Sequence, residues 1–190
     1  MFDNIKLNNF TIVGIDPGIS HLGMSAISVT PDLSKIDTIY FQTNDGDKAD
    51  LEYITTTTIE ERFTKLLHHK RVLKRWFDRH NPSFVIYEKP FIHGNRPTAF
   101  GALVESIMCI KQACYEFNPF IDIYEYTPLN IKKSVHAQNY QGKNFMTDAL
   151  INIPEIKPFI ENYLGFIDEH SIDSIAIAYT HLINLREGLV

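Results

Sequence analysis

The sequence lacks the features of exported, membrane-spanning or disulfide-bonded chains. No uninterrupted apolar run approaches the roughly 18 residues that cross a bilayer. The opening segment, MFDNIKLNNF, has neither the apolar stretch nor the small-residue cleavage site of a signal peptide. Only two cysteines occur, Cys109 and Cys114, and their spacing places them on different faces of a helix. We therefore expect two reduced, buried thiols and a cytoplasmic protein that contacts no membrane.

Positive charge is also scarce, because 18 basic residues face 23 acidic ones and the net charge is −5. This balance leans against nucleic acid binding, but phosphate binding depends on local charge. Seven basic residues and one acid, Asp78, lie between Arg62 and Arg79, which gives this segment +6 and leaves −11 for the rest. The segment is either a phosphate-contacting surface or the solvated outer face of an amphipathic helix. We favour the solvated face, because the acidic strand ends described below lie elsewhere.

No internal repeat or linker divides the chain, so we expect a single domain, 1–190. Apolar, β-branched runs predict strands over 11–15, 22–29, 36–43, 83–87 and 121–126. Apolar spacing predicts helices over 59–80, 98–117 and 170–185, with shorter helical stretches after Pro128 and a polar loop over 44–50. This order predicts an α/β fold with a five-stranded mixed sheet, three antiparallel strands followed by parallel strands, and helices on both faces.

Four polar residues stand where the predicted strands end or the last helix begins. Asp16 ends the first strand in an Asp-Pro-Gly turn, and Glu88 directly follows the apolar run Phe-Val-Ile-Tyr. His170 and Asp173 are three residues apart, so they share one helix face. Taken singly, each has an ordinary explanation as a turn residue, a strand end, or a helix cap formed by His170 or Ser171.

Together, these residues indicate a metal-dependent site. Two carboxylates end neighbouring strands, and a third carboxylate lies with a histidine on the closing helix. Hard oxygen ligands of this kind suit Mg²⁺ or Mn²⁺. Two such ions, roughly 4 Å apart, form the clamp used in phosphodiester hydrolysis. The residues therefore point to a nuclease.

Four segments resemble motifs of the RuvC-type Holliday junction resolvases. They are GIDPG at 14–18 with Gly23, VIYEKPF at 85–91, IKKSV at 131–135 with Lys143 eleven residues after Lys132, and HSIDSIAIA at 170–178. The resemblance extends over about 12–181. It implies a ribonuclease H-like fold and a crossover junction endodeoxyribonuclease that binds branched DNA. It also implies a homodimer, formed through the helix near 101–110, and two Mg²⁺ ions that Mn²⁺ can replace.

The resemblance also assigns roles to individual residues. Asp16, Glu88, His170 and Asp173 would be catalytic metal ligands; many members have aspartate at the position of His170, and others have histidine. Lys132 and Lys143 would offset charge on the scissile phosphate. Phe91 would insert at the crossover and stack on bases. Further DNA contacts would come from Lys89, Arg96 and Lys133. The simpler alternatives are solvated lysines and a Phe91 that packs against Pro90.

The expected reaction is resolution of a four-way junction by paired symmetric nicks. Alternatives are a nuclease of the same fold that cuts flaps, forks or hybrids, and a non-catalytic junction-binding protein. ATP-binding proteins of this fold class need glycine-rich phosphate loops, which the sequence lacks, and a second domain, for which 190 residues leave little room, so we expect no nucleotide cofactor. Few arginines with many asparagines, isoleucines and tyrosines fit an AT-rich genome, which suggests a bacteriophage protein in an infected host or a bacterial protein.

Overall fold

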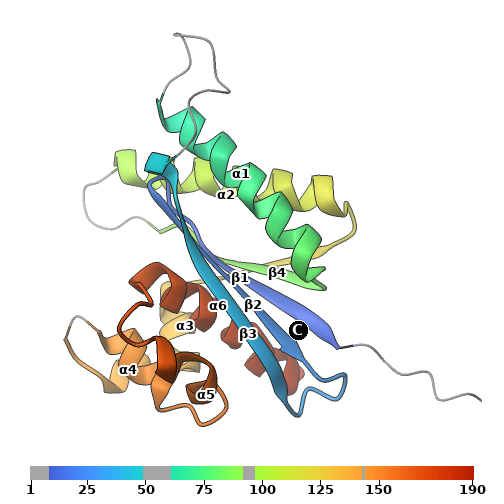
Figure 1. The fold of residues 1–190 in the computed structure, drawn as a ribbon, viewed down its shortest axis with the longest axis vertical. Helices are drawn as coiled ribbons and strands as arrows, with labels where there is room; N and C mark the ends of the chain where they lie inside the picture. The colour runs from blue at the N-terminus through green and yellow to red at the C-terminus, as the bar shows by residue number, and fades with distance from the viewer. Residues whose placement is uncertain (1–8, 49–60, 92–96, 143) are drawn as a thin grey trace, which may run out of the picture.

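The computed structural model describes residues 9–48, 61–91, 97–142 and 144–190 (Figure 1). Five strands form one sheet in the order β3-β2-β1-β4-β5. β1 pairs antiparallel with β2 and parallel with β4, β2 pairs antiparallel with β3, and β4 pairs parallel with β5. The predicted α/β fold and mixed sheet are therefore confirmed. The strands are β1 (Phe10–Asp16), β2 (His21–Val29), β3 (Ile36–Asp45), β4 (Phe84–Glu88) and β5 (Asp122–Tyr126).

Helices cover both faces of the sheet, as predicted (Figure 1). α1 (Glu61–His80) and α2 (Pro97–Phe117) lie on one face. The other face carries α6 (Glu169–Arg186) and three short helices, α3 (Pro128–Ser134), α4 (Phe145–Ile151) and α5 (Lys157–Ile160). Short 3₁₀ turns complete the chain as η1 (Gly46–Lys48), η3 (Ala137–Asn139) and η4 (Glu161–Tyr163).

Most element boundaries agree with the prediction within one or two residues. The polar loop predicted over 44–50 is wrong where described, because β3 continues to Asp45 and η1 follows it. Residues 59 and 60, predicted to open the first long helix, lie outside the described residues. Both cysteines are free and buried, as expected. No helix in the described part of the chain is long and apolar enough to cross a membrane.

Side chains along the central strands alternate between two hydrophobic cores. On β1, Ile12 packs into the core beneath α6, and Val13 packs into the core beneath α1 and α2. On β4, Ile86 and Val85 divide in the same way. Because successive side chains of a strand point to opposite faces, residues two apart share a face. This period decides which helix each strand-end carboxylate meets.

Helix α6 lies unusually close to β1 and β2. A Cβ at Gly14 would lie 2.2 Å from the carbonyl oxygen of Ser174 and 2.7 Å from the backbone nitrogen of Ala178. At Gly23 a Cβ would lie 2.1 Å from the carbonyl oxygen of His170. Only glycine permits this approach. The two glycines therefore fix the distance between the sheet and the N-terminal half of α6.

Candidate active site

The period of the strands brings the predicted acidic residues to one corner of the molecule. Asp16 is the last residue of β1 and Glu88 the last of β4, and the two strands run parallel as neighbours. Asp16 lies two and four residues beyond Gly14 and Ile12, and Glu88 lies two beyond Ile86, so both share the face that α6 covers. The close packing of α6 then adds His170 and Asp173.

The three carboxylates lie close enough to interact electrostatically. Burial, followed by the charges of Asp16 and Asp173, raises the pKa of Glu88 to about 7. Burial and the charge of Asp16 raise the pKa of Asp173 to about 7. Burial also raises the pKa of Asp16. The centre therefore gathers more negative charge than its neighbours neutralise, which is a condition that favours binding of a divalent cation.

His170 forms the one direct side-chain contact within this group that the structure shows among the described residues. Its Nδ1 lies 2.8 Å from Oδ2 of Asp16 and donates a hydrogen bond to that carboxylate. The hydrogen bond raises the pKa of His170. The ring of His21, at the start of β2, stacks on the His170 ring at 5.2 Å with an angle of 11°. His21 was not predicted, because the contact depends on how the β1–β2 turn meets α6.

The donor set fits a divalent metal by its chemistry. Among the described residues, however, no three histidine, cysteine, aspartate or glutamate side chains are close enough together to hold one ion. Oδ2 of Asp16 is engaged by the hydrogen bond to His170. The structure therefore shows the acidic neighbourhood without a closed ligand shell.

The N-terminus of α6 is capped by Asp168, so the alternative explanation of His170 or Ser171 as the cap is wrong. The carboxylate of Asp168 accepts a hydrogen bond from the backbone nitrogen of Ser171 at 2.8 Å. The Thr43 hydroxyl of β3 donates to the same oxygen at 2.6 Å. Asp168 thus anchors the helix that carries His170 and Asp173, and its side chain is committed to that role.

The predicted DNA-contacting residues have different environments. Lys132 on α3 lowers the pKa values of Glu88 and Asp173 through its charge, so it lies near both, and its ammonium sits 5.0 Å from the Phe145 ring centroid. Lys89 pairs with Glu125 at 3.0 Å. Phe91 is 45% exposed and Lys133 is also exposed. Lys143 and Arg96 lie outside the described residues.

The order and directions of the five strands, with carboxylates at the ends of β1 and β4 and α6 packed beside them, are those of a ribonuclease H-like fold. The model of the family described as "Crossover junction endodeoxyribonuclease RuvC" matches residues 12–181. The chain therefore belongs to the RuvC family of crossover junction endodeoxyribonucleases, enzymes that resolve Holliday junctions. Nucleases of this family depend on metal ions.

Individual relatives agree with this assignment. The RuvC protein of Ruminiclostridium cellulolyticum is 27% identical over 186 residues, covering 93% of this chain and 94% of its own. The fold is similar to that of Thermus thermophilus RuvC in complex with Holliday junction substrate, with a TM-score of 0.69, 18% identity, and coverage of 94% and 96%. It is also similar to the Fowlpox virus resolvase in complex with Holliday junction DNA, with a TM-score of 0.54, 16% identity, and coverage of 93% and 99%. A bacteriophage source gains no support from these relatives.

Proposed function

We propose that Asp16, Glu88 and Asp173, together with His170, form the catalytic centre that hydrolyses phosphodiester bonds of a four-way DNA junction. The observation that carries the proposal is the gathering of three carboxylates from β1, β4 and α6, each with a raised pKa. Burial of mutually repelling carboxylates has no structural benefit, and it is typical of a site that binds cations. Residues 1–190 act in this proposal as one nuclease domain.

The same four residues would hold Mg²⁺, or Mn²⁺ in its place, as two ions. When bound, these ions would activate water and stabilise the charge that develops on the phosphate and the leaving oxygen. The protein itself orients the carboxylates through the glycine contacts of β1 and β2 with α6. His170 in place of a fourth carboxylate makes the centre less negative, which would alter its metal preference, and we propose separately that His170 helps to release the product.

Lys132 supplies positive charge at the edge of the centre. Its charge lowers the pKa values of Glu88 and Asp173, which supports our proposal that it offsets charge on a phosphate bound near them. We propose the same role for Lys143. Phe91 follows β4 by three residues and is half exposed, which suits an aromatic wedge at the crossover. Lys89, Lys133 and Arg96 complete the proposed DNA contacts.

An exposed apolar surface on α1 and α2 supports the proposal of a homodimer. α2 covers the sheet with Ile107 and Ile110, which are buried. Its opposite side forms, with α1, a hollow of about 410 Å³ in which Phe63 and Met108 are each about half exposed. We propose that this α1–α2 groove meets its copy in the partner subunit. A two-fold dimer presents two centres to the two opposed strands of a junction, and paired symmetric nicks follow.

The test is cutting of end-labelled synthetic four-way junctions, with flap, fork and duplex controls, in Mg²⁺ and in Mn²⁺. We expect paired symmetric nicks in the junction. Asp16→Asn should keep junction binding and lose cutting, whereas Asp122→Asn, at an exposed position on β5, should cut like the wild type. Stronger cutting of flaps or forks would favour the alternative nuclease, and loss of binding together with cutting would give Asp16 a structural role.

A further inference from the structure

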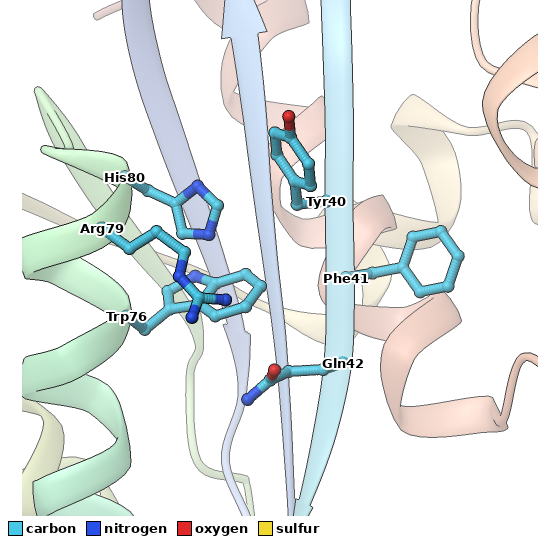
Figure 2. Close-up of a pocket in the computed structure, with 6 residues that line it drawn as sticks. All are labelled: Tyr40, Phe41, Gln42, Trp76, Arg79 and His80. Carbon is cyan, nitrogen blue, oxygen red and sulfur yellow. The ribbon is translucent and has the colours of Figure 1, made fainter.

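A polar groove runs along the outer side of α1, between that helix and the edge strand β3. It consists of two adjoining hollows of about 340 and 330 Å³ that share Gln42, Trp76 and Arg79. Figure 2 shows Gln42 extending from β3 toward the side on which α1 presents Trp76 and Arg79, while Phe41 points to the opposite side of the strand. The acidic centre contributes none of the lining residues.

The floor of the groove is aromatic and packed. Trp76 is 5% exposed and its ring lies 4.2 Å from that of His80. The His80 ring lies in turn 5.1 Å from the ring of Tyr40, which is 54% exposed at the rim. These contacts join α1 to β3, so the groove is held open by packed side chains (Figure 2).

Six of the seven cations in the basic segment of α1 divide into a paired and an unpaired group. Arg62, Lys65, Lys70 and Lys74 form ion pairs, with partners on η1, on α2 and within α1 itself. Lys65 and Lys70 are only 15% and 23% exposed, so for these four the predicted solvated face gives way to ion pairing with neighbouring elements. Arg75 and Arg79 form no ion pair within the described residues, and both line the groove.

No acidic side chain lines either hollow among the described residues. In a chain with a net charge of −5, two unpaired arginines beside the Gln42 amide make a local site for an anion. One helical turn separates the two arginines, which corresponds to a rise of about 6 Å. Phosphates of one DNA strand follow at about 3.4 Å along the duplex axis, so the pair spans roughly two phosphates.

The groove begins at the same end of the sheet as the acidic centre. Its upper limit is Asn44, which bonds His69 of α1 at 2.7 Å. The preceding residue, Thr43, faces the other side and bonds Asp168, the cap of α6. From Asn44 to Tyr40 the groove descends about 13 Å along β3. A DNA arm that leaves the centre around the β3 edge would reach it.

We propose that this α1–β3 groove binds the phosphodiester backbone of a junction arm, with Arg75 and Arg79 each contacting a phosphate and the Gln42 amide donating a further hydrogen bond. The proposal rests on the proposed function, because it assumes junction DNA as the substrate. It adds an arm-binding surface outside the cutting centre. Backbone contacts of this kind position the duplex without reading its sequence.

The experiment measures binding of a fluorescein-labelled synthetic four-way junction in EDTA at several salt concentrations. Arg75→Gln/Arg79→Gln should reduce the slope of log K against log salt by about 2 and weaken binding roughly 10- to 60-fold at 0.1 M salt. The matched control, Lys35→Gln/Lys157→Gln, removes two exposed, ion-paired lysines with the same change in charge and should leave both quantities unchanged. Circular dichroism confirms that both variants are folded.

An unchanged slope and affinity in the arginine variant would overturn the proposal. If, in addition, poly-glutamate bound the wild type and not the variant, the groove would be a site for an acidic peptide. An equal loss of junction affinity in the lysine control would show that the effect comes from net charge alone, and this result would also overturn the proposal. The binding assay contains no metal ion, so it does not depend on cutting. If the Asp16→Asn cutting test failed, the result of the binding assay would therefore still stand.

Discussion

The close contact between β1 and α6 predicts that Gly14→Ala will damage both stability and cutting. The new Cβ would lie 2.2 Å from the Ser174 carbonyl oxygen and 2.7 Å from the Ala178 nitrogen, where ordinary contacts begin at 3.4 Å. Both atoms are backbone, so no side chain can turn aside, and α6 must move away by about 1 Å. Overpacking of this kind costs about 1–3 kcal/mol. For a chain of this size, the melting temperature should fall by roughly 2–12 °C.

The same displacement should disturb the acidic centre, because His170 and Asp173 move with α6. A misplacement of about 1 Å can reduce a catalytic rate by roughly 100-fold. The assay is therefore single-turnover cutting of the labelled junction, run beside thermal unfolding. We expect cutting at 25 °C, where the variant remains folded, to fall far more than the folded fraction does.

Gly165→Ala provides the matched control. In the described structure nothing lies within 4 Å of a Cβ at this exposed position between η4 and α6. The substitution should therefore change stability by less than about 1 kcal/mol and leave cutting unchanged. A Gly14→Ala variant with the melting temperature and cutting rate of the wild type would refute the argument that glycine sets the distance between sheet and helix.

Three further predictions concern the dimer groove, a buried histidine and the acidic centre. Met108→Glu should yield monomers in sedimentation experiments and lose paired nicking, whereas Leu189→Glu, at an exposed position, should remain dimeric. Burial lowers the pKa of His181 to about 4, so as the pH falls the unfolded chain takes up a proton on this histidine before the folded chain does. The free energy of unfolding should therefore fall by about 3 kcal/mol as the pH drops from 6.5 to 4. In chemical denaturation, His181→Asn should remove this loss. The raised pKa of Asp173 has the opposite effect on stability, because the folded state keeps the proton to a higher pH than the unfolded state does. Above pH 7 the charged carboxylate therefore destabilises the fold. In EDTA at such a pH, Asp173→Asn should melt at a higher temperature than the wild type.

Local patterns in the sequence were sufficient to predict the positions of the acidic residues. A carboxylate that directly follows a short apolar strand must emerge at the sheet edge, which located Asp16 and Glu88. Residues three apart on a helix share a face, which joined His170 to Asp173. Each inference needed only the period of one element. The order of elements along the chain also predicted a mixed sheet, whereas the order of the strands within it depends on which strands pair.

Contacts between distant elements were not predictable from the same patterns. Asp168, His170 and Ser171 all have side chains that can cap a helix, and the choice of Asp168 depends on Thr43, which is 125 residues away. The division of the α1 cations depends equally on acids outside α1, such as Glu116 on α2. Sequence alone gave a single basic segment, whereas the fold separates its paired lysines from the arginines of the groove.

Repulsion within the acidic centre is opposed by two hydrogen bonds that anchor α6 to the sheet, from Ser25 and from Thr43. The raised pKa values of Glu88 and Asp173 mean that their charges destabilise the fold at neutral pH, and repulsion from Asp16 pushes Asp173 away from β1. Opposing this, Ser25 donates a hydrogen bond to the Ser174 carbonyl oxygen at 2.8 Å, and Thr43 holds the cap of α6. The anchors thus hold α6 at Asp168, five residues before Asp173, and at Ser174, directly after it. Removal of an acid should therefore stabilise the protein and abolish cutting, whereas removal of an anchor should reduce stability and cutting together.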